Sequence, residues 1–292
     1  MPVRDILLAV LVVAIWGFNF VVIKLGVADV PPLLLTGLRF FFAALPAVFF
    51  VKRPACAARW VIAFGLVLGV VKFGLLFVGM KVGMPAGLSS LVLQMQAFFT
   101  MGLAFFLLGE RPKPIQIVGA AVAALGILVI ASTRTGGGAP LGPFLMVLAA
   151  AACWGLANII TKKAGRIDML GFVVWASLVA PLPLFALSWV FEGGEAIVAT
   201  LSHPTPMAIA AVAYLAWPTT VLGFGIWSHL MSRHPAATVA PFSLLVPVFG
   251  LTSAFLVLGE PIGGREAIGA VLVIAGLVTN VFGPRVGLWL RR

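Results

Sequence analysis

Long apolar stretches separated by short polar breaks run through almost the whole chain. A membrane-spanning helix needs about 20 mostly apolar residues, because the hydrocarbon core of a bilayer is about 30 Å thick. Stretches of this length fall at about 5–26, 33–51, 60–80, 84–108, 114–131, 142–161, 170–191, 207–230, 235–258 and 266–284. The pattern predicts an all-α polytopic membrane protein with ten transmembrane helices.

The second half of the chain repeats the first at an offset of 150 residues. At this offset Pro85-Ala86 meets Pro235-Ala236, and Leu108-Gly109-Glu110 meets Leu258-Gly259-Glu260. The repeat predicts a five-helix unit at 1–131, a linker at 132–141 and a second five-helix unit at 142–292. Because five is odd, the second unit enters the membrane from the opposite side. The two units are therefore expected to be inverted repeats, which is a common architecture of secondary transporters.

Lysine and arginine concentrate on one side of the predicted helices. If the N-terminus is cytoplasmic, the cytoplasmic segments hold Arg4, Lys52, Arg53, Arg59, Arg111, Lys113, Lys162, Lys163, Arg166, Arg233, Arg285, Arg291 and Arg292. The opposite ends hold Lys24, Lys81, Arg134 and Arg265. The positive-inside rule therefore predicts that both the N- and the C-terminus are cytoplasmic. The net charge of +11 is read as this topology signal, with attraction to membrane lipid as a secondary effect and no nucleic acid as a partner.

Composition narrows the class further. With 62% hydrophobic and 9% charged residues, the chain does not have the composition of a soluble domain. Its two cysteines, Cys56 in a cytoplasmic loop and Cys153 in the sixth span, suggest neither a disulfide nor a metal site. No cofactor is expected. The sequence leaves open whether the protein is a monomer or a homodimer.

The repeated block also carries a family resemblance. Its first copy runs through Phe77-Val78-Gly79-Met80, Pro85-Ala86-Gly87, Leu108-Gly109-Glu110 and Leu125-Gly126, and the chain opens with Trp16-Gly17-Phe18-Asn19-Phe20. This set resembles the EamA-type branch of the drug/metabolite transporter superfamily. The resemblance implies a ten-helix exporter of small metabolites, often amino acids, from the bacterial inner membrane. It also implies that spans 3, 4, 8 and 9 surround a central cavity, with spans 5 and 10 at the periphery.

Few polar side chains lie inside the predicted spans, and such residues usually face the bundle interior or a wet cavity. Asn19, Gln94, Gln96 and Asn158 are candidates either for substrate contact or for hydrogen bonds between helices. Asn19 and Asn158 occupy near-equivalent places in spans 1 and 6. Gln94 and Gln96 diverge by about 200° on a helix, so that one of them can face a cavity while the other bonds a neighbouring helix.

Two cations also lie within the predicted spans. Lys72 has no acid within a span to pair with, so it is a candidate for binding a substrate carboxylate, for bonding backbone carbonyls or for snorkelling outwards. Arg39 begins two turns into its span and is expected to snorkel to the outer surface. The substrate is in either case expected to be a small molecule.

Aromatic residues and prolines complete the candidate site. Phe77, Trp175, Tyr214, Trp217 and Trp227 could cage an apolar or aromatic substrate, or they could simply pack the core. Candidate hinge or gate residues are Pro218, Pro241 and Pro247, whose competing interpretation is a structural kink.

All eight acids fall outside the spans or at their edges. Glu110 and Glu260 are expected to organise the tight turns after spans 4 and 9, for example by capping the helices that directly follow them. Proton or sodium coupling usually needs an intramembrane carboxylate or a histidine relay, and His229 is the one candidate for such a group. Transport is therefore predicted to be uncoupled. A multidrug or organic-cation exporter, an organophosphate or nucleotide-sugar translocator, and an intramembrane enzyme are lower-ranked alternatives, and an enzyme is not expected.

Overall fold

The computed structural model describes residues 1–133 and 141–289, apart from the side chains of 236, 237 and 284–289. Within this part of the chain, ten helical segments are long and apolar enough to cross a membrane. They span Val3–Asp29, Pro32–Phe49, Ala58–Lys81, Ala86–Leu108, Pro114–Ser132, Leu141–Ala164, Met169–Phe191, Pro206–Arg233, Ala240–Leu258 and Gly264–Gly283. All ten spans predicted from hydropathy are confirmed. Most of the predicted linker, with Arg134, and the terminal residues Arg291 and Arg292 lie outside the described residues.

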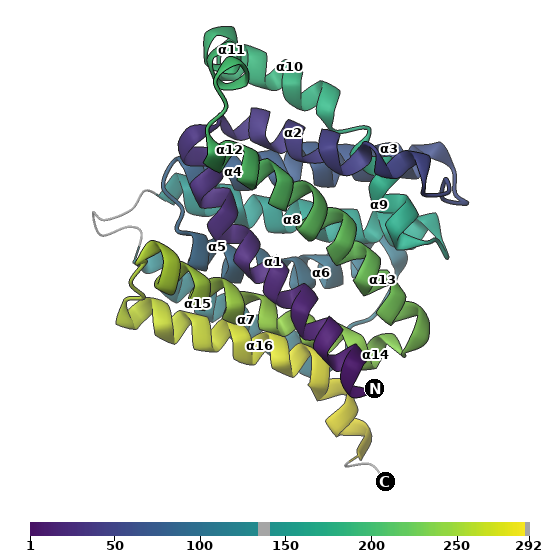
Figure 1. Ribbon diagram of the computed structural model, residues 1–292. Helices are drawn as coiled ribbons and strands as arrows, with labels where there is room; N and C mark the ends of the chain where they lie inside the picture. Colours follow the sequence, from purple (N-terminus) through teal and green to yellow (C-terminus); the bar gives the residue numbers. More distant parts are fainter. Residues whose placement is uncertain (134–140, 290–292) are drawn as a thin grey trace.

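Several spans are divided into successive helical segments (Figure 1). The first half contains α1 (Val3–Asp29), α2 (Pro32–Ala44), η1 (Ala47–Phe49), α3 (Ala58–Phe64), η2 (Gly65–Lys72), α4 (Phe73–Lys81), α5 (Ala86–Val92), η3 (Leu93–Met95), α6 (Gln96–Leu108) and α7 (Pro114–Ser132). The second half contains α8 (Leu141–Ala164), α9 (Met169–Ser177), α10 (Pro181–Phe191), α11 (Gly194–Ser202), α12 (Pro206–Tyr214), η4 (Leu215–Leu222), α13 (Gly223–Arg233), α14 (Ala236–Val239), η5 (Ala240–Leu245), α15 (Val246–Leu258) and α16 (Gly264–Trp289). Hydropathy did not predict α11, which lies beside α10 outside the main bundle.

Four glycines show how the two halves face each other. A Cβ added to Gly119 would lie 2.7 Å from the carbonyl oxygen of Gly276, and one added to Gly126 would lie 2.7 Å from that of Gly269. The early glycine of α7 thus meets the late glycine of α16, and the late one meets the early one, so these helices are antiparallel. Because α7 and α16 are the fifth spans of their halves, this crossing is the signature of inverted repeats.

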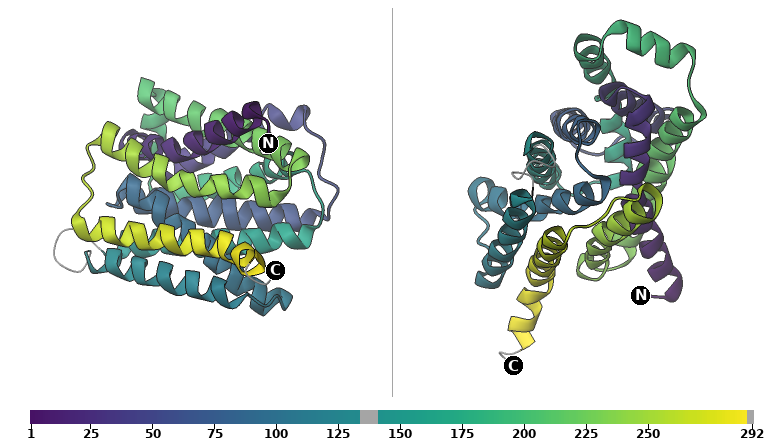
Figure 2. Two further views of the ribbon diagram at one scale, coloured as in Figure 1. Left: turned by 90° about the horizontal axis from the view of Figure 1, so that it is seen from below. Right: turned by 90° about the vertical axis from the view of Figure 1, so that its left-hand side faces the viewer.

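The peripheral position implied for spans 5 and 10 agrees with the structure. α7 and α16 lie side by side along one edge of the bundle in Figures 1 and 2. Their outward faces are apolar and exposed, with Leu128 64% and Val271 67% accessible, as expected for surfaces that meet lipid. The interior of the bundle is built instead from spans such as α3–η2–α4, where Leu76, Phe77 and Met80 are fully buried.

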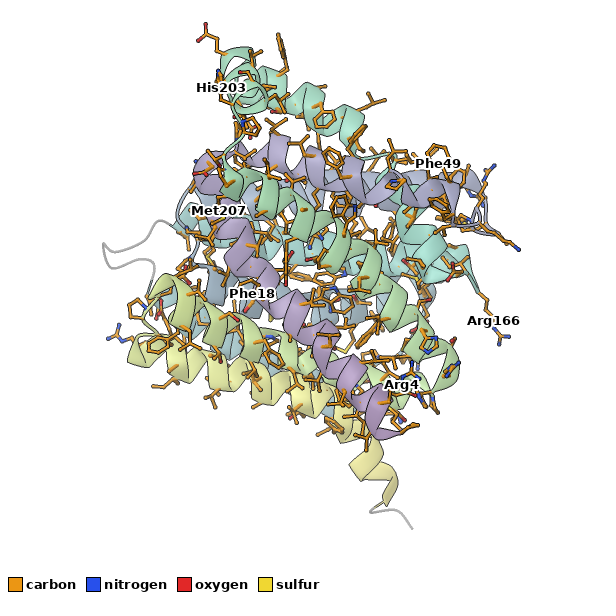
Figure 3. The ribbon with its side chains drawn as sticks, in the orientation of Figure 1. Arg4, Phe18, Phe49, Arg166, His203 and Met207 are labelled. Carbon is orange, nitrogen blue, oxygen red and sulfur yellow. The ribbon has the colours of Figure 1, made fainter. Side chains whose placement is uncertain are left out.

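The ends of the bundle are chemically different. Arg4 and Arg166 lie towards one end in Figure 3, while His203 and Met207 lie towards the other. Lys24 and Lys81, two of the cations at the less basic end, are bound to helix C-termini. The Lys24 ammonium donates to the carbonyl of Met80 at 2.8 Å, and the Lys81 ammonium donates to that of Ala28 at 3.3 Å. Cations favour helix C-termini, where carbonyls lack partners within the helix. Which end faces the cytoplasm stays a prediction.

The expected roles of Glu110 and Glu260 were wrong. The Glu260 carboxylate accepts hydrogen bonds from the backbone N–H groups of Ala86 at 2.9 Å and Gly87 at 3.0 Å. It therefore caps α5 of the first half, and not the helix that follows it. Glu110 pairs with Lys162 in the last turn of α8, the first helix of the second half. The sequence did not reveal these partners because both lie far away along the chain.

Candidate functional site

Two π-helical segments occupy matching places in the repeat. The segment η2 covers Gly65–Lys72, and η4 covers Leu215–Leu222, so their bounds differ by the same 150 residues that relate the two halves. Inside η4 the Thr220 hydroxyl donates to the carbonyl of Leu215, five residues earlier, at 2.9 Å. Such wide turns occur mostly as single insertions within helices, frequently at functional sites. Here they bring polar residues of spans 3 and 8 into the bundle interior.

The buried cations Arg39 and Lys72 lie next to these segments. Each side chain is only 2% exposed. The Arg39 guanidinium lies 4.1 Å from the centre of the Phe73 ring, and the Lys72 ammonium lies 3.3 Å from the same centre. Arg39 also donates two hydrogen bonds to the Thr220 hydroxyl, from Nε at 3.3 Å and from Nη2 at 3.2 Å.

The expectation that Arg39 snorkels outwards was therefore wrong. Snorkelling relieves a cation that has no partners inside the membrane protein. Arg39 has a hydroxyl acceptor and the faces of Phe40 and Phe73, at 5.5 Å and 4.1 Å from its guanidinium carbon. Lys72 likewise remains inside, between Phe73 and the ring of Trp154 at 4.5 Å. Hydropathy could mark both cations as costly, but it could not show that two spans direct them towards one ring.

No carboxylate neutralises this pair of cations. All eight acids lie in the described part of the chain, and none of them forms a salt bridge with Arg39 or Lys72. Instead, they lie at helix ends or near the surface. Their partners include His234 for Asp5, Thr205 for Asp29, Lys162 for Glu110, the N-terminus of α9 for Asp168, that of α2 for Glu192, that of α5 for Glu260 and Gly263 for Glu266. Glu195 lies in the first turn of α11.

Three buried polar atoms, in spans 1, 2 and 8, lack a hydrogen-bond partner among the described residues. They are Oδ1 of Asn19, Nη1 of Arg39 and Oγ1 of Thr219. The exposed fractions of these residues are 6%, 2% and 3%. A buried polar group without a partner costs about 1–3 kcal/mol, and more if it is charged. Native interiors contain few such groups, and each one calls for an explanation, such as a strained or functional site or a bound water or ion.

Hydrogen bonds and ring contacts link Arg39, Lys72, Thr219 and Thr220, and Asn19 is placed beside them by its position on α1. Lys72 and Arg39 share Phe73, Arg39 bonds Thr220, and the Trp16 indole donates to the carbonyl of Thr219 at 3.0 Å. Asn19 follows Trp16 by about one turn of α1, so the two side chains lie on neighbouring faces of that helix. Figure 3 labels Phe18, the residue before Asn19, near the middle of the bundle. We call Asn19, Arg39, Lys72, Thr219 and Thr220 the central polar cluster.

Comparison with known proteins assigns this architecture. The EamA-like transporter family matches residues 4–132 and again residues 141–282. The chain belongs to the EamA-like transporter family. It is 46% identical to a "probable amino-acid metabolite efflux pump" of Salmonella typhimurium, over 97% of this chain and 96% of that protein. It is 44% identical to the protein of the same name in Escherichia coli, with the same coverage.

More distant relatives share the same extent. The "probable terminal-alkyne amino-acid exporter" of Streptantibioticus cattleyicolor is 30% identical, over 92% of this chain and 90% of that protein. A solved crystal structure matches with a TM-score of 0.63 at 22% identity, covering 96% of this chain and 98% of its own, which supports the fold. The EamA protein described here is a multi-pass transporter of the bacterial inner membrane, as the resemblance predicted.

Among the predicted site residues, Gln96 and Asn158 form a separate network in this EamA protein. The Asn158 amide donates to Oε1 of Gln96 at 2.7 Å and to the Thr100 hydroxyl at 3.0 Å. The expectation that one glutamine bonds a neighbouring helix is confirmed for Gln96. Gln94 is buried on the same span, at 7% exposure. The central polar cluster thus draws on spans 1, 2, 3 and 8, whereas the resemblance implied spans 3, 4, 8 and 9 around the cavity.

Of the aromatic candidates, Phe77 and Tyr214 lie nearest to the cluster. Phe77 is fully buried with its ring edge-on to Phe73, at 6.1 Å between centres. Tyr214 directly precedes η4, and its hydroxyl donates to the carbonyl of Ile15 at 3.0 Å. Trp227 packs on Trp16 with 5.2 Å between ring centres.

Two other tryptophans lie away from the cluster. Trp175 donates to the carbonyl of Val51 at 3.2 Å, near the basic end of the bundle. Trp217 is 50% exposed and donates to the carbonyl of Phe42 at 3.1 Å, so it belongs to the outer surface of the bundle.

The candidate hinge prolines lie in irregular segments, but they are not required for them. Pro218 lies inside η4, Pro241 lies in the 3₁₀ segment η5, and Pro247 lies in the first turn of α15. The first half has the matching π segment η2 and the shorter 3₁₀ segment η3 without any proline at the equivalent positions. The irregular turns are therefore a property of the repeat, and the hinge role of the prolines stays a prediction.

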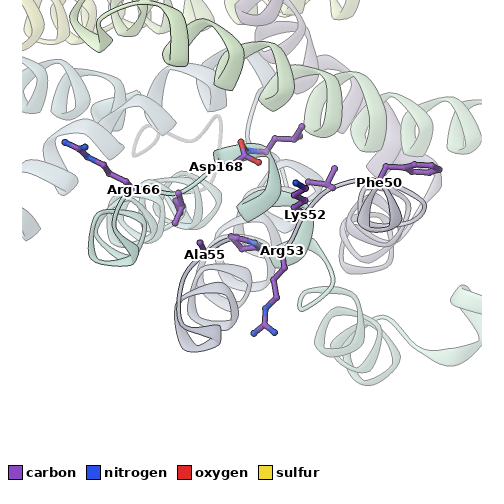
Figure 4. A pocket seen from close by; sticks show the side chains of 10 residues that line it. Phe50, Lys52, Arg53, Ala55, Arg166 and Asp168 are labelled. Carbon is purple, nitrogen blue, oxygen red and sulfur yellow. Dashed lines mark hydrogen bonds between the residues drawn. The ribbon is translucent and has the colours of Figure 1, made fainter.

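Two cavities open at the ends of the bundle. One, of about 440 Å³, lies between the loop at 50–55 and the segment at 166–170, with Lys52, Arg53, Arg166 and Asp168 in its wall (Figure 4). The other, of about 660 Å³, lies at the opposite end, where Lys24 and Glu260 line it. Neither of these two cavities is lined by the central polar cluster, whose residues are buried inside the bundle.

Proposed function

We propose that this EamA transporter exports small carboxylate-bearing metabolites, above all amino acids, by alternating access between its inverted halves. The observation that carries the proposal is the pair of buried cations, Arg39 and Lys72, without a carboxylate partner. A buried ion costs several kcal/mol, whereas a cation–π contact returns about 0.5–2 kcal/mol. The rings beside each cation therefore do not offset the free-energy cost of burying it. An anionic group of the substrate would supply the remaining stabilisation.

The names of the relatives agree with this chemistry. Two curated proteins more than 40% identical over nearly their full length are named as amino-acid metabolite efflux pumps, and a third relative is named as an amino-acid exporter. Aromatic side chains lie against the cations, namely Phe40, Phe73 and Trp154, and Phe77 packs on Phe73. They favour substrates with apolar or aromatic side chains.

We further propose that export is uncoupled and runs down the substrate gradient. The eight carboxylates lie away from the membrane interior, and His229 is exposed near the end of α13. A pH gradient across liposomes should therefore leave the initial rate of substrate uptake unchanged. A strong dependence on that gradient, lost in His229→Ala, would instead establish proton coupling through this histidine.

One alternative gains support from Arg39. An organophosphate translocator needs several cationic groups in its pocket, and Arg39 supplies a second one beside Lys72. The same charges disfavour an organic-cation exporter, because a cationic substrate would be repelled by two buried cations. An intramembrane enzyme remains the alternative from another class, which family membership disfavours.

A competition screen in proteoliposomes tests the proposal. The competitors are the twenty amino acids, a quaternary ammonium dye and a sugar phosphate. We expect amino acids to inhibit uptake by the unaltered protein, and we expect this inhibition to be lost in Lys72→Leu. This variant introduces leucine, the residue at the matching position 222. Lys163→Gln, at an exposed position, is the matched control. Transport of the dye or the sugar phosphate alone would overturn the assignment to amino acids.

A further inference from the structure

The unpaired atoms of the central polar cluster are of two kinds. Nη1 of Arg39 is a cationic donor, while Oδ1 of Asn19 is an acceptor and the Thr219 hydroxyl is both donor and acceptor. Cations alone would suit any carboxylate. Oδ1 of Asn19 has no use in binding a carboxylate, because two oxygens without a proton between them repel each other, so it requires a donor from the substrate. The Thr219 hydroxyl can donate to a carboxylate, or it can accept from the same substrate donor.

The register of the repeat explains why Asn19 does not share the hydrogen bonds of Asn158. Gly17 packs against Phe249 of α15, just as Gly155 packs against Phe99 of α6. With these glycines aligned, Asn158 matches Phe20, and Asn19 matches Ala157. The expected near-equivalence of Asn19 and Asn158 is thus off by one residue, or about 100° on a helix. Asn158 faces Gln96 and Thr100, whereas Asn19 lies on the face next to Trp16.

The π segment η4 separates the roles of two adjacent threonines. The Thr220 hydroxyl is fully used, because it donates to the carbonyl of Leu215 and accepts from Arg39. It thereby fixes the guanidinium in place and leaves Nη1 of Arg39 without a partner. Thr219, whose carbonyl accepts from Trp16, keeps its own hydroxyl unpaired. The unpaired Nη1 of Arg39 and the unpaired hydroxyl of Thr219 are therefore linked through Thr220, which bonds Arg39 and directly follows Thr219.

We propose that Asn19 and Thr219 form an ammonium subsite that recognises the free α-amino group of the substrate, while Arg39 and Lys72 bind its carboxylate. The inference rests on the proposed function and narrows it to α-amino acids with an unblocked amino group. An α-ammonium group offers three N–H donors next to the carboxylate. These donors satisfy Oδ1 of Asn19 and Oγ1 of Thr219 at the same time as the carboxylate satisfies Arg39.

The subsite predicts how strongly the transporter prefers a free amino acid over analogues with a modified amino group. An N-acetyl amide or a 2-hydroxyl group offers one donor where the ammonium group offers three, so one of the two buried acceptors is left unpaired and the analogue is rejected. One unpaired buried group costs about 1–3 kcal/mol, which corresponds to a factor of about 5 to 150 in transport efficiency. We therefore expect a free amino acid to be preferred at least about tenfold over its N-acetyl derivative and over the corresponding 2-hydroxy acid.

The test uses the full-length transporter in proteoliposomes. L-phenylalanine, L-leucine and L-serine are each compared with their N-acetyl derivative and their 2-hydroxy acid, by uptake of the labelled compound. The variants are Asn19→Leu and Thr219→Val, with Thr219→Ser as the conservative replacement. Asn158→Leu is the matched control, because its amide is already bonded within the protein. Thermal unfolding of each purified variant monitors the fold.

We expect the ratio of amino-acid uptake to analogue uptake to fall towards one in Asn19→Leu and Thr219→Val, while uptake of the analogues persists. Thr219→Ser, which keeps the hydroxyl, should show the preference of the unaltered protein. Asn158→Leu should lower stability without changing the preference. Equal uptake of amino acids and their analogues by the unaltered protein would overturn the ammonium subsite but leave carboxylate export standing. Uptake of none of these compounds would overturn the proposed function, and the subsite with it.

Discussion

Arg39 of α2 and Lys72 of η2 place two positive charges against one aromatic ring, that of Phe73, at 4.1 Å and 3.3 Å from its centre. Both side chains are almost fully buried, and the carboxylates of the chain are engaged elsewhere. Like charges held this close in a low-dielectric interior destabilise the empty state. Binding of an anionic ligand relieves this repulsion. Removing one of the two cations should therefore raise the stability of the protein but lower its transport activity.

Replacing Lys72 by leucine tests this opposition directly. Lys72→Leu removes one unpaired cation and introduces the residue present at the matching position of the second half. Replacing buried ionic groups with apolar ones of similar volume is often neutral or stabilising by about 1–4 kcal/mol. We expect a higher melting temperature in detergent together with at least a tenfold loss of amino-acid transport. Lower stability with wild-type transport would show that Lys72 is a structural residue.

The crossing of α7 and α16 gives a prediction about stability alone. In Gly126→Ala the new methyl group would lie 2.7 Å from the carbonyl oxygen of Gly269, so the helices must separate. Overpacking of this kind costs about 1–3 kcal/mol. Gly102 in α6 is the matched control, because a Cβ there meets nothing within 4 Å. Gly102→Ala should be neutral or stabilise by about 0.5–1 kcal/mol, since alanine favours the helix. Equal melting temperatures for the two variants would contradict the close crossing.

Hydropathy and the internal repeat predict the fold well because the membrane leaves few choices. Within the bilayer every backbone polar group must be satisfied inside the protein, so each long apolar stretch must form a helix. The inverted arrangement then follows from an odd number of spans in each half. The π segments η2 and η4 could not be predicted in this way, because a π turn changes the hydrogen-bond register of a helix but leaves its apolar composition unchanged.

The candidate site was only partly predictable for a related reason. The sequence marks Asn19, Lys72 and Gln96 as polar residues in apolar surroundings, but it does not give the direction of a side chain relative to other helices. Arg39 was therefore assigned to the outer surface, and Thr219 was not assigned to the site. Trp217, by contrast, was placed in the cage although it faces outwards. Hydrogen bonds between distant spans, such as that from Arg39 to Thr220, decide these cases.

The cap formed by Glu260 predicts a link between the two halves. Its carboxylate accepts from two N–H groups at the start of α5, where a negative charge is favoured. Glu260→Ala should lower the free energy of unfolding by about 1–2 kcal/mol, because it leaves these donors without their acceptor. Thermal unfolding measures the effect, and Glu195→Ala in α11 is the control. Similar melting temperatures for both variants would indicate that the cap contributes little.

Cysteine labelling can determine the orientation of the bundle. Cys56 lies near the basic end, in the loop that forms one wall of the smaller cavity, whereas Glu195 lies in α11 between spans 7 and 8. The positive-inside rule places the first in the cytoplasm and the second on the opposite side. In a Cys153→Ala background, a membrane-impermeant maleimide should label Cys56 in inverted membrane vesicles but not in intact spheroplasts. Combining Glu195→Cys with removal of Cys56 should reverse this result. Labelling of Cys56 from outside the cell would place the basic end outside, and the direction of transport proposed here would then need to be reassigned.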